Sequence, residues 1–200
     1  MNTLDIIGAI IGLAYIVSEY RADRWFWPLS LLMSGFYAVI YFQATCYANF
    51  GICCYNFVMS VYGILVWRGV LVGTRRAASA QERKITSCPT RLWPWLIAAT
   101  LLLTLLFRWL LGLLGESTLP LVDGLSSALN IVGMWMLTQK YWQQWFTWLL
   151  VEPLMIGLCL VSGLYASAAM YAVYEIFVIM GMIRWRKESL TQSPNQAITQ

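Results

Sequence analysis

Seven apolar segments, each long enough to cross a bilayer as a helix, constrain this chain more than any other feature. A membrane-spanning helix needs about 20 mostly apolar residues. Only 11% of the residues are charged, whereas a soluble domain has about 25%. We therefore expect an all-α integral membrane protein with seven transmembrane helices. The segments cover residues 4–20, 26–43, 48–67, 93–113, 122–140, 144–162 and 165–185.

The 13 Lys and Arg residues predict how the chain lies across the membrane. All except Arg108 fall in alternate connecting segments, in the polar segment 68–92, or at and just beyond the ends of the apolar segments 122–140 and 165–185. Basic loops stay in the cytoplasm, so we expect the amino terminus outside and the carboxyl terminus inside. We predict a solvated cytoplasmic linker at 68–92 and a disordered cytoplasmic tail at 187–200. This distribution explains the net charge of +4 without a nucleic-acid partner.

Residues that match at a constant offset of 118 indicate an internal repeat. Residues 1–67 and 122–186 are then two copies of one three-helix unit. Because three is an odd number, the additional helix at 93–113 allows both copies to face the same way, as parallel repeats do in some transporters. The matches are Asp5 with Asp123, Trp27 with Trp145, Tyr47-Ala48 with Tyr165-Ala166, Gly63 with Gly181, and Trp67-Arg68 with Trp185-Arg186.

A carboxylate in the middle of an apolar segment is the strongest candidate for function. Glu152 is the only charge between Lys140 and Glu175, and on a helix it shares one face with Trp148. Pro153 frees the carbonyl group of the preceding turn. An anion beside an aromatic plane suits a flat organic cation. The alternative is a strained packing helix with a protonated Glu152.

Further candidates lie where a cavity between the two copies would be expected. The copies differ there, since Trp148 and Glu152 match Ser30 and Ser34, so we expect an asymmetric pocket. Asn130 could instead join helices by a hydrogen bond. The other candidate residues for substrate binding are Tyr41, Tyr55, Asn56, Asn130, Tyr171, Tyr174 and Glu175.

Several residues have simpler explanations. We expect Glu19 to form a surface ion pair with Arg21. Histidine is absent and the cysteines number five, so we expect neither a metal site nor a cofactor. We expect Cys53, Cys54 and Cys159 to be buried as small apolar residues. Tryptophans near helix ends are typical of membrane-interface anchors. These are Trp25, Trp93, Trp95 and Trp185.

Short motifs occur in both halves of residues 1–187. In the first half these are Trp27, Tyr41-Phe42-Gln43, Tyr47-Ala48, Ser60-Val61-Tyr62-Gly63 and Trp67. In the second half they are Val122-Asp123, Met136-Leu137-Thr138-Gln139-Lys140, Trp145-Phe146-Thr147-Trp148, Gly163-Leu164-Tyr165 and Arg184-Trp185. Through these motifs, residues 1–187 resemble the bacterial nicotinamide riboside transporter (PnuC) family.

The resemblance implies a protein of the bacterial inner membrane with a fold like that of the SWEET sugar carriers, assembled as a homotrimer. It implies facilitated diffusion of a vitamin, with a cytoplasmic kinase trapping the product. The family signature is Trp-x-x-Trp-x-x-x-Asn, in which the second Trp and the Asn line the vitamin site. Trp148 matches that Trp, but Glu152 occupies the Asn position.

The carboxylate at position 152 affects the choice of substrate, because an ionised carboxylate only accepts hydrogen bonds. It suits the pyridinium of nicotinamide riboside and the thiazolium of thiamine, and it suits neutral riboflavin poorly. We expect nicotinamide riboside, with thiamine as the alternative. A receptor is a further alternative, and an enzyme is disfavoured because no histidine can serve as a base. Glu152 and Glu175 also leave proton coupling open.

Overall fold

The computed structural model describes residues 3–23, 25–43, 45–68, 84–115, 117, 119–161 and 165–192, with side chains from Gly12 onward except at 158, 166, 167 and 192. Within these ranges the chain forms seven α-helices and two short 3₁₀ helices. They are α1 (Thr3–Arg21), α2 (Phe26–Gln43), α3 (Tyr47–Trp67), η1 (Thr90–Leu92), α4 (Trp93–Leu114), α5 (Pro120–Thr138), η2 (Trp142–Gln144), α6 (Trp145–Val161) and α7 (Tyr165–Gln192).

Six helices of the described chain, α2 to α7, are long and apolar enough to cross a membrane. An all-helical membrane protein is thereby confirmed. The expected span at 4–20 stays a prediction, because the side chains of residues 1–11 lie outside the described part.

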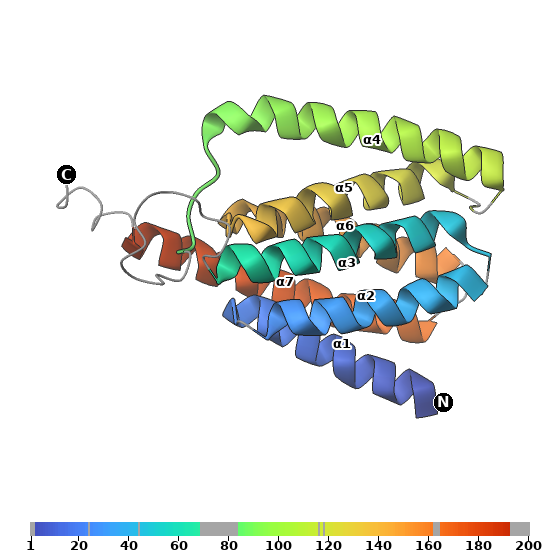
Figure 1. Ribbon diagram of the computed structural model, residues 1–200, viewed down its shortest axis with the longest axis horizontal. Helices are drawn as coiled ribbons and strands as arrows, with labels where there is room; N and C mark the ends of the chain where they lie inside the picture. Colours follow the sequence, from blue (N-terminus) through green and yellow to red (C-terminus); the bar gives the residue numbers. More distant parts are fainter. Residues whose placement is uncertain are drawn as a thin grey trace.

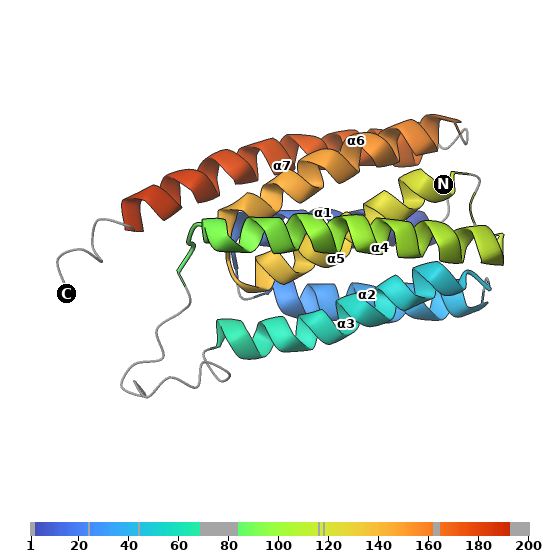
Figure 2. The same cartoon turned by 90° about the horizontal axis from the view of Figure 1, so that it is seen from above.

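Two helix pairs flank a central group of helices. Figure 2 shows α2 and α3 on one side, α6 and α7 on the other, and α1, α4 and α5 between them. In this arrangement α1 packs against α2 and α7, whereas α5 packs against α6 and α3. The long helix α4 packs mainly against α5 and runs along the edge of the bundle (Figure 1).

The basic chain segments lie at one end of the bundle. In Figure 1 the carboxyl ends of α1, α3 and α5 meet the amino ends of α2, α4 and α6 at the end where the C-terminus also lies. Arg21, Arg68, Arg91 and Lys140 belong to these ends. Arg108 lies in α4, nearer the opposite end. The bundle therefore has one strongly basic end.

The offset of 118 recurs in the packing of tryptophan on glycine. Trp27 lies so close to Gly63 that a methyl group on that glycine would overlap the indole, and Trp145 lies in the same way on Gly181. Trp27 is also perpendicular to Trp67, with ring centroids 5.3 Å apart, and Trp145 is perpendicular to Trp185 at 5.7 Å. Close helix packing thus requires glycine opposite each buried indole.

The same offset relates two hydrogen bonds that cross the bundle. The indole N–H of Trp67 donates to the carbonyl oxygen of Thr138 at 3.2 Å, and that of Trp185 donates to the carbonyl oxygen of Tyr20 at 3.1 Å. The donors are 118 positions apart, and so are the acceptors. Each bond joins the third helix of one half to the end of the first helix in the other half.

Backbone turns at these helix ends also correspond. Ala22 and Lys140 both adopt left-handed conformations, with φ of 54° and 53°. Each N–H group donates to a carbonyl three residues earlier, at 2.9 Å in both cases. Since non-glycine residues are uncommon at positive φ, two such turns 118 positions apart indicate one shared local structure. The ammonium of Lys140 lies 4.1 Å from the ring centroid of Trp67.

The prediction of a solvated linker at 68–92 is wrong for its last residues. Ile85 and Cys88 are buried, and burial raises the pKa of the Cys88 thiol. Thr86 exchanges backbone hydrogen bonds with the second half, donating to the Lys140 carbonyl at 3.0 Å and accepting from Trp142 N–H at 3.1 Å. These two buried side chains and the backbone hydrogen bonds of Thr86 therefore attach the end of the basic segment to the bundle. Residues 69–83 lie outside the described part.

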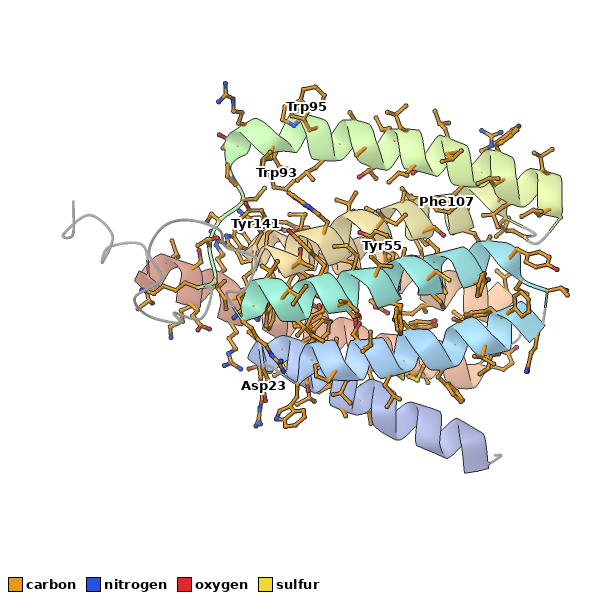
Figure 3. All side chains as sticks on the ribbon, viewed as in Figure 1. Asp23, Tyr55, Trp93, Trp95, Phe107 and Tyr141 are labelled. Atoms are coloured by element: carbon orange, nitrogen blue, oxygen red, sulfur yellow. The ribbon has the colours of Figure 1, made fainter. Side chains whose placement is uncertain are left out.

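Three other expectations need correction. The tail was expected to be disordered from Lys187, but α7 continues to Gln192, and residues 193–200 lie outside the described part. Trp185 is fully buried and does not anchor an interface, whereas Trp25 and Trp95 are exposed. Figure 3 shows Trp95 on the outer side of α4. Cys54 is exposed, unlike Cys53 and Cys159.

Replacing Gly63 or Gly181 by Ala tests the tryptophan–glycine contacts. Each new methyl group would overlap an indole, so each variant should lose about 1–3 kcal/mol of stability. Thermal unfolding of the protein in detergent measures the loss. Gly157→Ala is the matched control, because an added methyl group there meets nothing within 4 Å and helix propensity favours Ala. Unchanged unfolding temperatures for Gly63→Ala and Gly181→Ala would contradict this packing.

Candidate functional site

The inward face of α6 carries a buried carboxylate and a buried indole. Glu152 and Trp148 are 8% and 9% exposed. The helix continues through Pro153 without interruption. Trp148 lies against α5 beside Gly133, whose lack of a side chain leaves room for the Thr147 hydroxyl next to the indole. Glu152 Oε2 and Trp148 Nε1 have no hydrogen-bond partner within the described chain.

Tyrosines from two other helices surround this carboxylate. Tyr171 and Tyr174 of α7 lie close enough to Glu152 for the carboxyl group to interact electrostatically with both hydroxyl groups. Their rings are nearly perpendicular, with centroids 6.3 Å apart. From α2, Tyr41 lies near Tyr171 and Tyr37 near Tyr174. The structure thus brings together Trp148, Glu152, Tyr171, Tyr174 and Tyr41 from three helices.

Tyr174 reaches α1 because a glycine faces it. A methyl group on Gly12 would overlap the Tyr174 hydroxyl. Tyr15, one turn further along α1, lies within electrostatic range of both Tyr174 and Glu152. The first helix therefore forms a wall of the same site, although the predicted site residues include none from α1.

A second carboxylate lies near the first. Glu175 is within electrostatic range of Glu152, and its Oε2 is buried without a hydrogen-bond partner in the described residues. Buried polar atoms are normally hydrogen-bonded in native proteins. Two unpaired carboxylate oxygens beside several aromatic rings are the arrangement that a positively charged aromatic ligand would satisfy.

Three other predicted site residues lie on α3 and α5. The Tyr55 hydroxyl donates to the Ile131 carbonyl at 2.8 Å, and Figure 3 shows Tyr55 on α3, the helix that faces α5. The side-chain oxygens of Asn56 and Asn130 are buried without partners among the described residues. The Tyr55 hydroxyl thus joins α3 to α5, while both asparagines retain unused hydrogen-bonding capacity.

Two polar residues beside the site, Glu19 and Gln144, are absent from the predicted set. Glu19 is 2% exposed and not at the surface, so the expected ion pair with Arg21 is wrong. It lies next to Gln144 and Trp148. Gln144 is completely buried. The repeat offset could have found both residues, because it pairs Glu19 with Leu137 and Gln144 with Phe26. A polar residue matched to an apolar one marks a position where the copies differ.

Comparison with known proteins shows which family this chain belongs to. The family model described as nicotinamide mononucleotide transporter matches residues 2–187. The chain belongs to this transporter family. Its relatives are membrane transporters, so this protein is a multi-pass membrane transporter and not an enzyme.

Curated relatives of this transporter include carriers named for two vitamins. It is 22% identical to the nicotinamide riboside transporter PnuC of Escherichia coli, over 92% of this chain and 85% of the relative. It is 27% identical to the riboflavin/roseoflavin transporter RibM of Streptomyces davaonensis, over 90% of this chain and 83% of the relative. The crystal structure of the vitamin B3 transporter PnuC has the same fold, with a TM-score of 0.70 at 22% identity, covering 92% of this chain and 80% of that chain.

Replacing Tyr55 by Phe separates packing from ligand binding. The change removes the hydroxyl that donates to Ile131, so stability should fall by about 1 kcal/mol. Vitamin affinity should change by less than about twofold, because a packing residue contributes little to binding. Thermal unfolding and calorimetric titration with nicotinamide riboside measure the two effects. A large loss of affinity at unchanged stability would place Tyr55 in the site.

Proposed function

We propose that this transporter carries nicotinamide riboside across the bacterial inner membrane by facilitated diffusion. The observation that carries the proposal is the buried carboxylate of Glu152 beside the indole of Trp148, because its Oε2 has no hydrogen-bond partner among the described residues. The pyridinium ring of nicotinamide riboside is flat and positively charged, so it can stack on the indole and neutralise the carboxylate. Several relatives named for this vitamin support the choice.

The binding residues in this proposal come from both halves of the chain. Trp148, Glu152, Tyr171, Tyr174 and Glu175 surround the ring, and Tyr41 closes the aromatic wall. Asn56 and Asn130 are available for the amide or the sugar, because their oxygens are buried and unpaired within the described residues. A carboxylate at 152 would also suit thiamine, the second candidate, since its thiazolium carries the same charge.

The architecture we propose has two parallel three-helix repeats and seven membrane spans in a 3+1+3 order. Matching tryptophan–glycine contacts and matching indole hydrogen bonds at the offset of 118 support the repeats. The basic end of the bundle supports a cytoplasmic carboxyl terminus and an outer amino terminus. By its resemblance to the PnuC family, the protein would assemble as a homotrimer, and a cytoplasmic kinase would trap the vitamin by phosphorylation.

Uptake into proteoliposomes tests the transport mechanism. Labelled nicotinamide riboside should equilibrate across the membrane without ATP or an ion gradient, and an imposed pH gradient should not drive accumulation. Accumulation against a concentration gradient would instead indicate coupling. Binding without flux would identify a receptor and refute the proposed transport.

Replacing Glu152 by Gln tests the charge pairing. The variant keeps the shape of the side chain but loses the anion, so the affinity for nicotinamide riboside should fall at least about tenfold, or about 1.4 kcal/mol. Calorimetric titration measures the change. Glu188→Gln makes the same chemical change outside the proposed site and should leave affinity unchanged. An unchanged dissociation constant for both nicotinamide riboside and thiamine in Glu152→Gln would refute the pairing.

Thiol labelling tests the orientation. In a background without the five native cysteines, Leu119→Cys and Arg91→Cys place single thiols at exposed positions on opposite ends of the bundle. A membrane-impermeant maleimide should label Leu119→Cys in intact spheroplasts and Arg91→Cys only after permeabilisation. The reverse pattern would show that the basic end faces outward.

A further inference from the structure

Glu19 and Gln144 form a buried polar pair for which the described chain provides little hydrogen bonding. Glu19 is 2% exposed and Gln144 is completely buried. The carboxylate lies within hydrogen-bonding reach of the amide and of the Trp148 indole. Even so, Glu19 Oε1, both polar atoms of the Gln144 amide and Trp148 Nε1 make no well-formed hydrogen bond among the described residues. Burying such groups without well-formed hydrogen bonds destabilises a protein.

The fold itself does not require polar residues at this place. At the offset of 118, Leu137 corresponds to Glu19 and Phe26 to Gln144. Leu137 and Phe26 are both completely buried in the same apolar cluster. The equivalent position in the other half is therefore closed by an apolar pair. A transporter that needed only packing could use the same apolar pair twice.

The polar pair continues the surface that holds Trp148 and Glu152. Gln144, Trp148 and Glu152 follow one another at intervals of four along η2 and α6, so they share one face. Glu19 meets this face from α1 and lies within electrostatic range of Glu152. Eight residues of helix span about 12 Å, a length suited to an aromatic ring joined to a sugar.

We propose that Glu19 and Gln144 bind the sugar hydroxyl groups of the vitamin while its ring lies at Trp148 and Glu152. A carboxylate can accept hydrogen bonds from two adjacent hydroxyls, and an amide can both donate and accept. The inference rests on the proposed function and adds the orientation of the vitamin in its site. The ring lies toward the middle of α6, and the sugar lies toward the basic end of the bundle.

The test compares nicotinamide riboside with its 2′,3′-dideoxy analogue. The wild-type protein should bind the analogue at least about tenfold more weakly, because the buried polar groups are left unpaired. The double variant Glu19→Leu with Gln144→Phe copies the apolar pair of the other half. It should bind the two compounds with dissociation constants within about threefold of each other. Its unfolding temperature without ligand should be equal to or above that of the wild type.

The single variant Glu19→Gln keeps the experiment informative if the double variant fails to fold. It preserves side-chain volume and should also reduce the discrimination between the two compounds. The matched control is Leu137→Ile, which changes the equivalent apolar position and should keep the wild-type ratio. If the variants and the wild type discriminate equally, the inference is overturned and Glu19 with Gln144 has another role. If the wild type does not bind nicotinamide riboside at all, the proposed function itself fails.

Discussion

Two exchanged hydrogen bonds hold the helix ends of this transporter in place. Trp67 donates to the Thr138 carbonyl and Trp185 to the Tyr20 carbonyl, so each half supplies a donor and an acceptor to the other. In an apolar surrounding an unpaired carbonyl is costly, and the two bonds fix how α3 and α7 meet α5 and α1. The position of the site follows, because α7 carries Tyr171 and Tyr174 while α1 carries Gly12, Tyr15 and Glu19.

The two halves distribute their large side chains differently around this common frame. In the first half Tyr15 on α1 lies beside Ser30 on α2. At the corresponding positions Gly133 on α5 lies beside Trp148 on α6. The volume is similar, but the aromatic group comes from the first helix in one half and from the second helix in the other. This exchange brings an indole next to Glu152 and leaves the pocket asymmetric.

The sequence was sufficient to predict the helices, the offset of 118 and the aromatic residues around Glu152, because these depend on local periodicity and on repeated residue types. It could not predict the burial of Glu19, since proximity to Arg21 along the chain suggested a surface ion pair. The burial of Trp185 was missed for a similar reason. A position near a helix end does not reveal that another helix covers it. Both depend on contacts between distant segments.

The short segment before α4 has a consequence for how the protein can be divided. Thr86 is bonded through its backbone to Lys140 and Trp142, and Cys88 N–H donates to the Gln143 side chain at 2.8 Å. Everything from Lys84 onward is thus fastened to the second half. Cutting the polypeptide just before Lys84 would yield two fragments, three helices and four helices, that could be expressed separately and reassembled, which makes this position suitable for split reporters.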